Sequence, residues 1–394
     1  MSWVMALGTI NPMHLSGSTR EEEVQSFLIY PALLMIIISY ILDNKAKAIK
    51  FRALKTCTIF LLLLLCIIFT SDILYSFGNT ILVKPSYVIY IKLLMCIASF
   101  YILTILFIRS KDIHRNLLIY SITMVIIVLP FFFNIGPLNN CFEFSNGRLW
   151  MYGENPNTFS ARLCVAILFF AYSLTQNSYV LKYKIFFSLS IVLLFYFVIL
   201  SGSRGSLAIV GLSLLYLFIR KLSWKQIILI LIPLIAVVGI VFVKLADSDM
   251  FVVFERFQSL SSKGDLREVL MAEALEIWKS QPILGCGQNG YNNEKLILFK
   301  EYLDSHCIVT SILAMGGIIG LCLFSLFIGF LMKYVSVCVR KSPLPLILCI
   351  FMFAVSLKTG GIIAYFFMYY IYAICMAYVY LLNKNQNPIE GYHL

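Results

Sequence analysis

Two long apolar stretches meet with almost no spacer at the turn Ser201-Gly202-Ser203-Arg204-Gly205-Ser206. An ionisable residue between stretches of membrane-spanning length is costly, and it usually faces a polar cavity or a partner. Arginine matches the geometry of phosphate oxygens, and the backbone N–H groups of glycine and serine approach an anion closely. We therefore predict that Arg204, with Ser203 and Gly205, binds an anionic group. The alternative is an interfacial arginine whose guanidinium extends to water.

A second arginine, Arg267, lies in the first turn of an amphipathic helix that we predict over 266–280. Asp265 and Glu268 fit an N-cap and a capping box, and Pro282 ends the helix. The residues that we expect to form one apolar stripe at helical spacing are Leu266, Val269, Leu270, Ala274 and Ile277. A cation in the first turn opposes the helix dipole, whereas an anion bound there is held by both the helix end and the guanidinium. The alternatives are a solvated arginine and a helix that simply lies on the membrane surface.

His306 begins the next apolar stretch, after a cap that we predict at Asp304 or Ser305. The positive end of a helix favours a neutral imidazole, which is the form that a general base requires. A carboxylate such as Asp304 would oppose this effect. The alternative is a polar histidine at the membrane interface.

Arg148 and Asn157 precede a further apolar stretch. Arg148 can add an anion contact, and Asn157 can cap the following helix, which alone would explain it. Asp247 and Asp249 resemble the metal-binding D-x-D pair of nucleotide-sugar enzymes, but two aspartates in a loop are common. We therefore expect no metal and no cofactor.

Membrane-spanning helices must position these residues. The chain has 394 residues, of which 61% are hydrophobic and only 13% are charged, whereas soluble domains carry about 25% charged residues. Repeated apolar runs of about 20 residues are typical of transmembrane helices. We predict an all-α polytopic bundle, a single integral membrane domain over 1–394. Its eleven spans are expected at 26–42, 56–74, 87–108, 117–134, 158–175, 184–201, 206–220, 226–243, 308–332, 344–358 and 361–382.

Lysine and arginine gather in alternate short loops between these spans, and such loops face the cytoplasm. This pattern accounts for the net charge of +12 without nucleic-acid binding. It predicts an N-terminus outside and a C-terminus inside. The polar segments 134–157, 201–206 and 244–306 then share the outer face, and the last of these is one large loop that contains the amphipathic helix.

An ordered set of residues runs through the segment 148–320: Arg148, Gly153 and Asn157, then Ser203-Arg204-Gly205, then Arg267 with Trp278, Pro282, Gly285 and Gly287, and finally His306 with Gly317 and Gly320. In its residues and their order, this set resembles the O-antigen polymerase and ligase superfamily of bacterial inner membranes. One departure is Cys307, where that family often has asparagine. Another is the number of spans, because some members have twelve.

The resemblance implies metal-independent, inverting glycosyl transfer at the periplasmic face from an undecaprenyl-diphosphate-linked oligosaccharide. Arg204, Arg267 and Arg148 would stabilise the departing diphosphate, and His306 would activate the acceptor hydroxyl. Asp304, Asp265 and Glu154 are alternative bases. Membrane lipid, a chain-length regulator protein and a flippase are the expected partners.

We favour a polymerase of lipid-linked repeat units over a ligase to lipid A-core, because the outer loop is small for docking a core oligosaccharide. A lipid-linked glycan flippase or another transporter is a further alternative. It would carry ionisable residues at mid-span, whereas the charges here collect at one face, apart from Lys92 and Arg162. A membrane protein without activity would leave the outer arginines unexplained.

Overall fold

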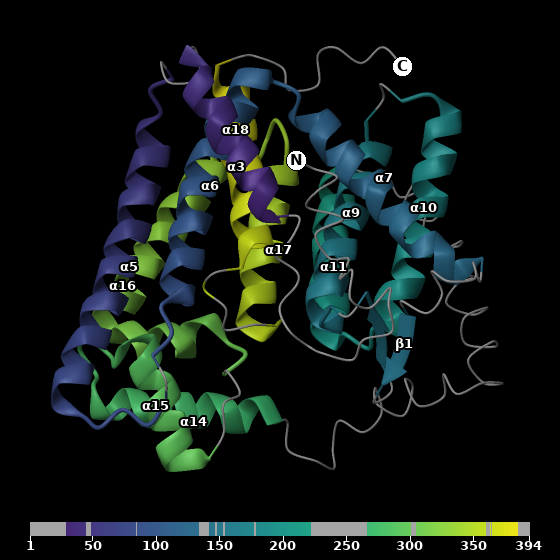
Figure 1. Ribbon diagram of the computed structural model, residues 1–394. Coiled ribbons are helices and arrows are strands. Elements are labelled where there is room, and N and C mark those ends of the chain that lie inside the picture. The colour runs from purple at the N-terminus through teal and green to yellow at the C-terminus, as the bar shows by residue number, and fades with distance from the viewer. Residues whose placement is uncertain are drawn as a thin grey trace. The chain divides into compact units, whose positions relative to one another are not determined.

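A computed structural model describes residues 29–44, 49–83, 85–133, 142–145, 148–152, 154–176, 179–221, 266–300, 305–359, 363 and 365–384. Within these ranges the regular elements are helices, apart from one β-hairpin (Figure 1). The helices are α3 (Ile29–Leu42), α5 (Arg52–Gly78), α6 (Val88–Ser110), α7 (Ile113–Phe132), α9 (Pro156–Leu174), α10 (Leu181–Leu200), α11 (Arg204–Lys221), α14 (Leu266–Ser280), α15 (Gly287–Phe299), α16 (Ile308–Ser336), α17 (Leu344–Thr359) and α18 (Phe366–Asn383).

Seven of these helices are long and apolar enough to cross a membrane: α5, α6, α7, α9, α10, α16 and α18. Three shorter apolar helices, Pro31–Leu42, Arg204–Ile219 and Leu344–Lys358, coincide with three further predicted spans. The predicted span 226–243 lies outside the described residues. The structure therefore confirms a helical protein with many apolar helices, whereas the number of spans stays a prediction.

The chain divides into two compact units. One unit contains α7, α9, α10, α11 and the hairpin, and the other contains α5, α6 and the helices from α14 to α18. The boundary near the N-terminus falls within α3, after Met35.

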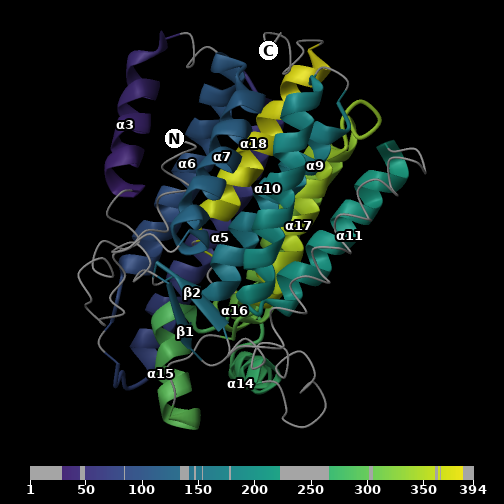
Figure 2. The same cartoon turned by 90° about the vertical axis from the view of Figure 1, so that its right-hand side faces the viewer.

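In the first unit, α9 is the central helix and packs against α7, α10 and α11. Nearly all of its residues are buried, as expected for a helix that carries mainly apolar or small side chains on every face. The hairpin was not expected from the sequence. β1 (Phe142–Ser145) pairs antiparallel with β2 (Arg148–Met151), so that Ser145 lies opposite Arg148. The hairpin lies at the end of the unit where α9 begins (Figure 2).

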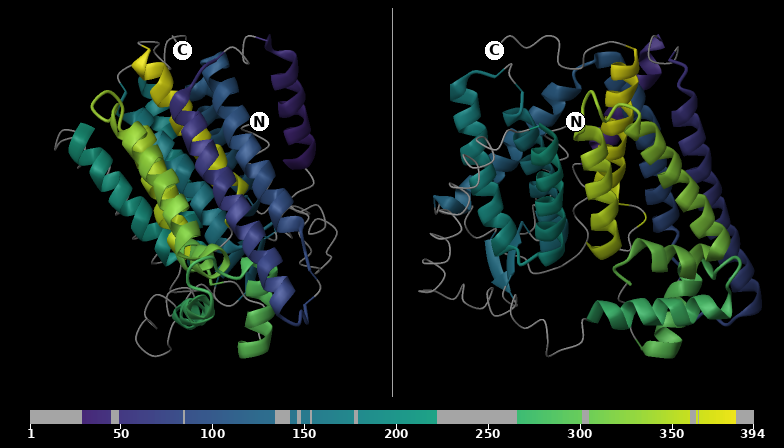
Figure 3. Two further views of the ribbon diagram at one scale, coloured as in Figure 1. Left: turned by 90° about the vertical axis from the view of Figure 1, so that its left-hand side faces the viewer. Right: turned by 180° about the vertical axis from the view of Figure 1, so that it is seen from behind.

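In the second unit, α5 and α16 pack side by side along much of their length (Figure 3). α18 packs against α6 and α17, and it buries four tyrosines, at positions 369, 370, 372 and 378. α14 and α15 lie across one end of the α5–α16 pair (Figure 1).

α16 is broken at Gly317, whose φ of 61° and ψ of −161° are not helical. The loop that follows α14 fills this break. Ile318 N–H donates to the Pro282 carbonyl at 3.0 Å, and Cys286 N–H donates to the Ala314 carbonyl at 2.9 Å. Backbone groups at membrane depth need such partners because lipid offers none. Pro282 and Gly317, picked out in the sequence, therefore lie in one backbone-to-backbone contact.

Alanine in place of Gly317 should strongly destabilise the protein. A Cβ there would lie 2.2 Å from the Ile283 carbonyl oxygen, in a conformation that only glycine adopts readily. We expect a loss of about 3 kcal/mol or more in the free energy of unfolding. The matched control is Gly329→Ala on the same helix, where a Cβ meets nothing within 4 Å. Thermal unfolding in detergent would measure both variants, and equal stability of the two would contradict the role of the break.

Candidate functional site

Arg148 joins three segments that are far apart in the sequence. From the start of β2, its Nε donates to the Ser201 carbonyl at 2.9 Å, and its Nη2 donates to Asn157 Oδ1 at 2.5 Å. The hairpin, the start of α9 and the turn before α11 therefore meet at this guanidinium. The sequence indicated each segment separately but not their contact.

Asn157 does not cap α9, so that part of the sequence prediction was wrong. The N-cap is Asn155, whose side chain accepts a hydrogen bond from the Asn157 N–H at 2.9 Å, and Pro156 is the first helical residue. Proline suits that position because its missing N–H is not needed there. The Asn157 side chain is therefore left to bind Arg148.

Buried serines organise the turn between α10 and α11. The Ser201 hydroxyl donates to the Val198 carbonyl at 2.7 Å, and the Ser203 hydroxyl donates to Ser206 Oγ at 3.1 Å. Gly202 has a φ of 60°, where glycine is favoured. The Ser203 hydroxyl is thus used within the turn. Gly205 lies in the first turn of α11, where backbone N–H groups lack helical partners.

Arg204 is the first residue of α11 and is partly exposed. One of its guanidinium nitrogens, Nη1, is buried and has no hydrogen-bond partner among the described residues. A buried donor without a partner is unfavourable by about 1–3 kcal/mol, and more when the group is charged. An anion at the start of this helix would satisfy the donor and would also be stabilised by the helix end.

A buried ion pair lies beside the start of α9. Arg162 Nη2 lies 3.2 Å from Glu154 Oε1, and both side chains are at least 95% buried. Burial raises the pKa of the Glu154 carboxyl, and the Arg162 guanidinium opposes this rise. Because Glu154 is buried and faces a cation, its surroundings do not favour it as the alternative base.

His306 lies in a short turn immediately before α16. The Ser305 hydroxyl oxygen holds this turn: it accepts from Thr310 Oγ1 at 3.0 Å and is bonded to Ser311 Oγ at 2.7 Å. The helix begins later than predicted, because its N-cap is Cys307, which makes no side-chain cap. Asp304 lies outside the described residues.

His306 has a φ of 53°, in the left-handed region. Among the described residues, the other non-glycine residues with positive φ are Lys111, Tyr152 and Lys300. Lys111 and Lys300 are helix C-caps, where this conformation is usual. Tyr152 and His306 have no such explanation, and each lies within a segment that the sequence singled out. Backbone strain of this kind gathers at functional sites.

Arg267 lies in the first turn of α14, as the sequence predicts. Leu270, Ala274 and Ile277 form the buried stripe of this helix, whereas Val269, predicted to lie on the stripe, is 51% exposed. Trp278 Nε1 donates to the Pro282 carbonyl at 3.0 Å, which explains why these two residues occur together. α14 packs against α15 and α16, so its apolar stripe faces protein.

The structure thus places the predicted residues in two groups. Arg148, Asn157, Ser203, Arg204 and Gly205 belong to the first unit, and Arg267 and His306 belong to the second. Gly153, Asp265 and the Asp247–Asp249 pair lie outside the described residues.

Sequence reasoning missed Asp72, a carboxylate in the apolar helix α5 that is only 3% exposed. Its position inside a predicted span was the available signal, since ionisable residues there are rare. His114, which falls in the short loop between the predicted spans 87–108 and 117–134, is instead a buried residue of α7 that is hydrogen-bonded to Tyr179. That expectation was wrong because the helix begins at Ile113, earlier than its apolar run suggests.

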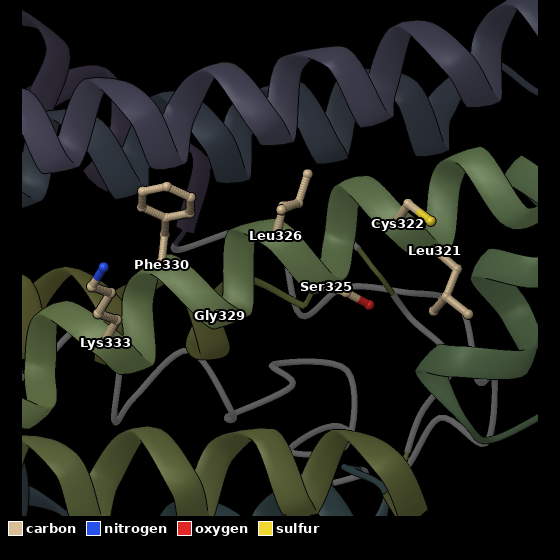
Figure 4. A pocket seen from close by; sticks show the side chains of 7 residues that line it. All are labelled: Leu321, Cys322, Ser325, Leu326, Gly329, Phe330 and Lys333. Carbon is tan, nitrogen blue, oxygen red and sulfur yellow. The ribbon is translucent and has the colours of Figure 1, made fainter.

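A hollow of about 680 Å³ lies along one face of α16, between Leu321 and Lys333 (Figure 4). Its seven lining residues are mainly apolar, with Lys333 at one end, and none of the predicted site residues is among them. It therefore offers no group suited to glycosyl transfer. Across the part of the chain that the structure describes, no three histidine, cysteine, aspartate or glutamate side chains cluster as metal ligands would.

Residues 189–325 match the family model described as O-antigen ligase. The match runs from α10 into α16 and includes Arg204, Arg267 and His306, whereas Arg148 and Asn157 precede it. No curated protein matches the chain. The family match confirms the resemblance that the sequence motifs indicate.

Proposed function

We propose that this chain, whose residues 189–325 match the O-antigen ligase family model, polymerises undecaprenyl-diphosphate-linked repeat units. The reaction would take place at the periplasmic face of the bacterial inner membrane, with the loop 244–306 on that side. The observation that carries this proposal is the buried Arg204 Nη1, which lacks a partner among the described residues at the start of a helix. Such a donor suits the phosphate oxygens of a lipid diphosphate.

The proposed transfer forms one C–O bond at the anomeric carbon and breaks another. The acceptor hydroxyl oxygen attacks the anomeric carbon from the face opposite the diphosphate, so the configuration inverts. The electron pair of the broken C–O bond stays on the diphosphate oxygen. Arg204 would receive this charge, with Arg148 and Arg267 as further contacts, because preorganised donors stabilise charge that develops in the transition state.

His306 is the proposed base that accepts the proton of the acceptor hydroxyl. Its turn is fixed by the Ser305 hydroxyl, and its φ of 53° is unfavourable unless the surroundings impose it. The residue lies just before the short helical segment between Ile308 and the break at Gly317. The positive end of this segment favours a neutral imidazole over an imidazolium.

A ligase that transfers glycan to lipid A-core uses the same leaving group, so the site alone does not separate the two activities. A lipopolysaccharide gel of a deletion strain does. Loss of a polymerase leaves core lipid with one repeat unit, which is the expected result. Loss of a ligase leaves bare core and accumulates lipid-linked polymer, and loss of a flippase traps repeat units on the cytoplasmic leaflet.

The proposed membrane arrangement places the N-terminus in the periplasm and the C-terminus in the cytoplasm. Single cysteines introduced at positions 204 and 306 should both be labelled from the periplasmic side. Labelling of the two positions from opposite leaflets would contradict a shared active site. Membrane lipid, a flippase that delivers the repeat units and a chain-length regulator are the proposed partners.

A further inference from the structure

Asp72 caps a helix that lies more than two hundred residues away in the sequence. Its Oδ1 accepts hydrogen bonds from the Asn289 N–H at 2.9 Å and the Gly290 N–H at 3.2 Å. Its Oδ2 accepts from Asn289 Nδ2 at 2.5 Å. The Asn289 N–H lies in the first turn of α15 and has no helical partner, and a negative charge at this end is favourable.

α15 lies directly against the backbone of α5. A Cβ on Gly287 would lie 2.4 Å from Asp72 Cα, and a Cβ on Gly290 would lie 2.8 Å from the Tyr75 ring. Neither glycine can be enlarged without moving α15 away from α5. The Asp72 contact is therefore the centre of a close interface, and small shifts of α15 would break it.

Two asparagines one turn apart fix the same face of α15 to the segment after α5. Asn289 Oδ1 accepts from the Ser86 N–H at 2.7 Å, and Asn293 Oδ1 accepts from the Leu82 N–H at 2.8 Å. Asn289 thus donates to Asp72 and accepts from Ser86 with one amide. Its orientation is set by both partners.

α15 in turn holds α14. Lys295 Nζ lies 2.9 Å from Glu273 Oε2, and the two side chains are only 1% and 12% exposed. α14 carries Arg267 in its first turn. The loop between the two helices fills the break in α16, the helix that His306 precedes.

We infer that Asp72 is a positioning residue that holds α15, and through the Lys295–Glu273 pair α14 with Arg267, against the ends of α5 and α16. This inference rests on the proposed function for its activity readout. Asp72 touches no substrate; it acts through Arg267. Misplacement of a charged contact by about 1 Å can cost up to 10²-fold in rate.

Exchanging the two side chains of the contact tests the inference. Asp72→Asn keeps an oxygen for the two N–H groups but sets an NH2 group against the NH2 group of Asn289. Asn289→Asp sets two carboxylates against each other. The double variant Asp72→Asn/Asn289→Asp restores the bond between the two side chains, because the new amide donates to the new carboxylate, which still accepts from the Ser86 N–H.

The full-length protein in lipid nanodiscs would be assayed with lipid-linked repeat units extracted from the deletion strain. Each single variant should lower kcat about tenfold with little change in KM, and the double variant should return to within about twofold of the unchanged protein. In an Arg267→Ala background, Asp72→Asn should lower kcat by less than about twofold further, because both changes act on one contact. The matched control is Glu276→Gln, which removes the exposed ion pair to Lys279 on α14 and should leave kcat unchanged.

Hydrogen exchange of the α15 amides gives a second readout. It should be faster in both single variants and should return to the original rate in the double variant. Asn289→Ala, which removes the side-chain bonds to Asp72 and to the Ser86 N–H but keeps the two backbone N–H bonds to Asp72, serves if the charged variants do not fold, and should lower kcat about threefold.

Single variants with full kcat, or a double variant as slow as the singles, would overturn the inference. If the unchanged protein transfers no glycan, the proposed function fails. The exchange rates of α15 still decide in that case whether Asp72 holds this helix.

Discussion

Replacing Arg204 with alanine should lower the rate of glycan transfer about 10²–10³-fold at an unchanged protein level. The change removes the buried Nη1, which has no partner within the described residues, and with it the proposed donor to the departing diphosphate. Protein stability should not fall, since the variant loses no internal bond of that nitrogen. The measurement is kcat for elongation of lipid-linked repeat units, together with the length of the glycan ladder in cells.

Two further variants make the Arg204 result specific. Arg204→Lys keeps the positive charge but loses the planar guanidinium, whose paired N–H groups can bind two phosphate oxygens. It should therefore retain an intermediate rate. Arg115→Ala, at an exposed position of α7 in the same unit, should leave the rate within about twofold, as for most exposed positions. Full-length ladders from Arg204→Ala cells would refute the assignment of this residue.

Replacing His306 should abolish catalysis while it leaves the fold intact. Removal of a general base typically costs about 10²–10⁴ in rate. Two substitutions separate the imidazole from the backbone that carries it. His306→Ala keeps a side chain at a φ of 53°, whereas His306→Gly relieves the strain of that conformation.

We therefore expect both His306 variants to be inactive and the glycine variant to be more stable, by about 1 kcal/mol. Thermal unfolding and kcat, measured on the same samples, check the two halves of this prediction. An active glycine variant would show that the strained backbone, and not the imidazole, matters at this position. Activity in both variants would move the proton acceptor elsewhere, with Asp304 the first residue to test.

The sequence by itself determined the class of the protein and the order of its motifs. Long apolar runs predict helices from local composition alone, and the ten apolar helices within the described residues lie where such runs occur. Charged residues stand out against this background, so Arg204, Arg267 and His306 were identified without any contact being known. Pro282 was identified as the end of a helix, whereas Gly285, Gly287 and Gly317 were identified through the family resemblance, and the reason for these glycines was not visible.

Only the tertiary structure decided which of these residues meet. Arg148 bonds to Ser201 and Asn157, and Asp72 bonds to Asn289. Gly317 needs to be glycine because the Ile283 carbonyl lies against it. Hydropathy and helical period describe neighbours along the chain, whereas these contacts join residues up to 217 positions apart. They depend on how close two backbones approach, and no local pattern of residues specifies that distance.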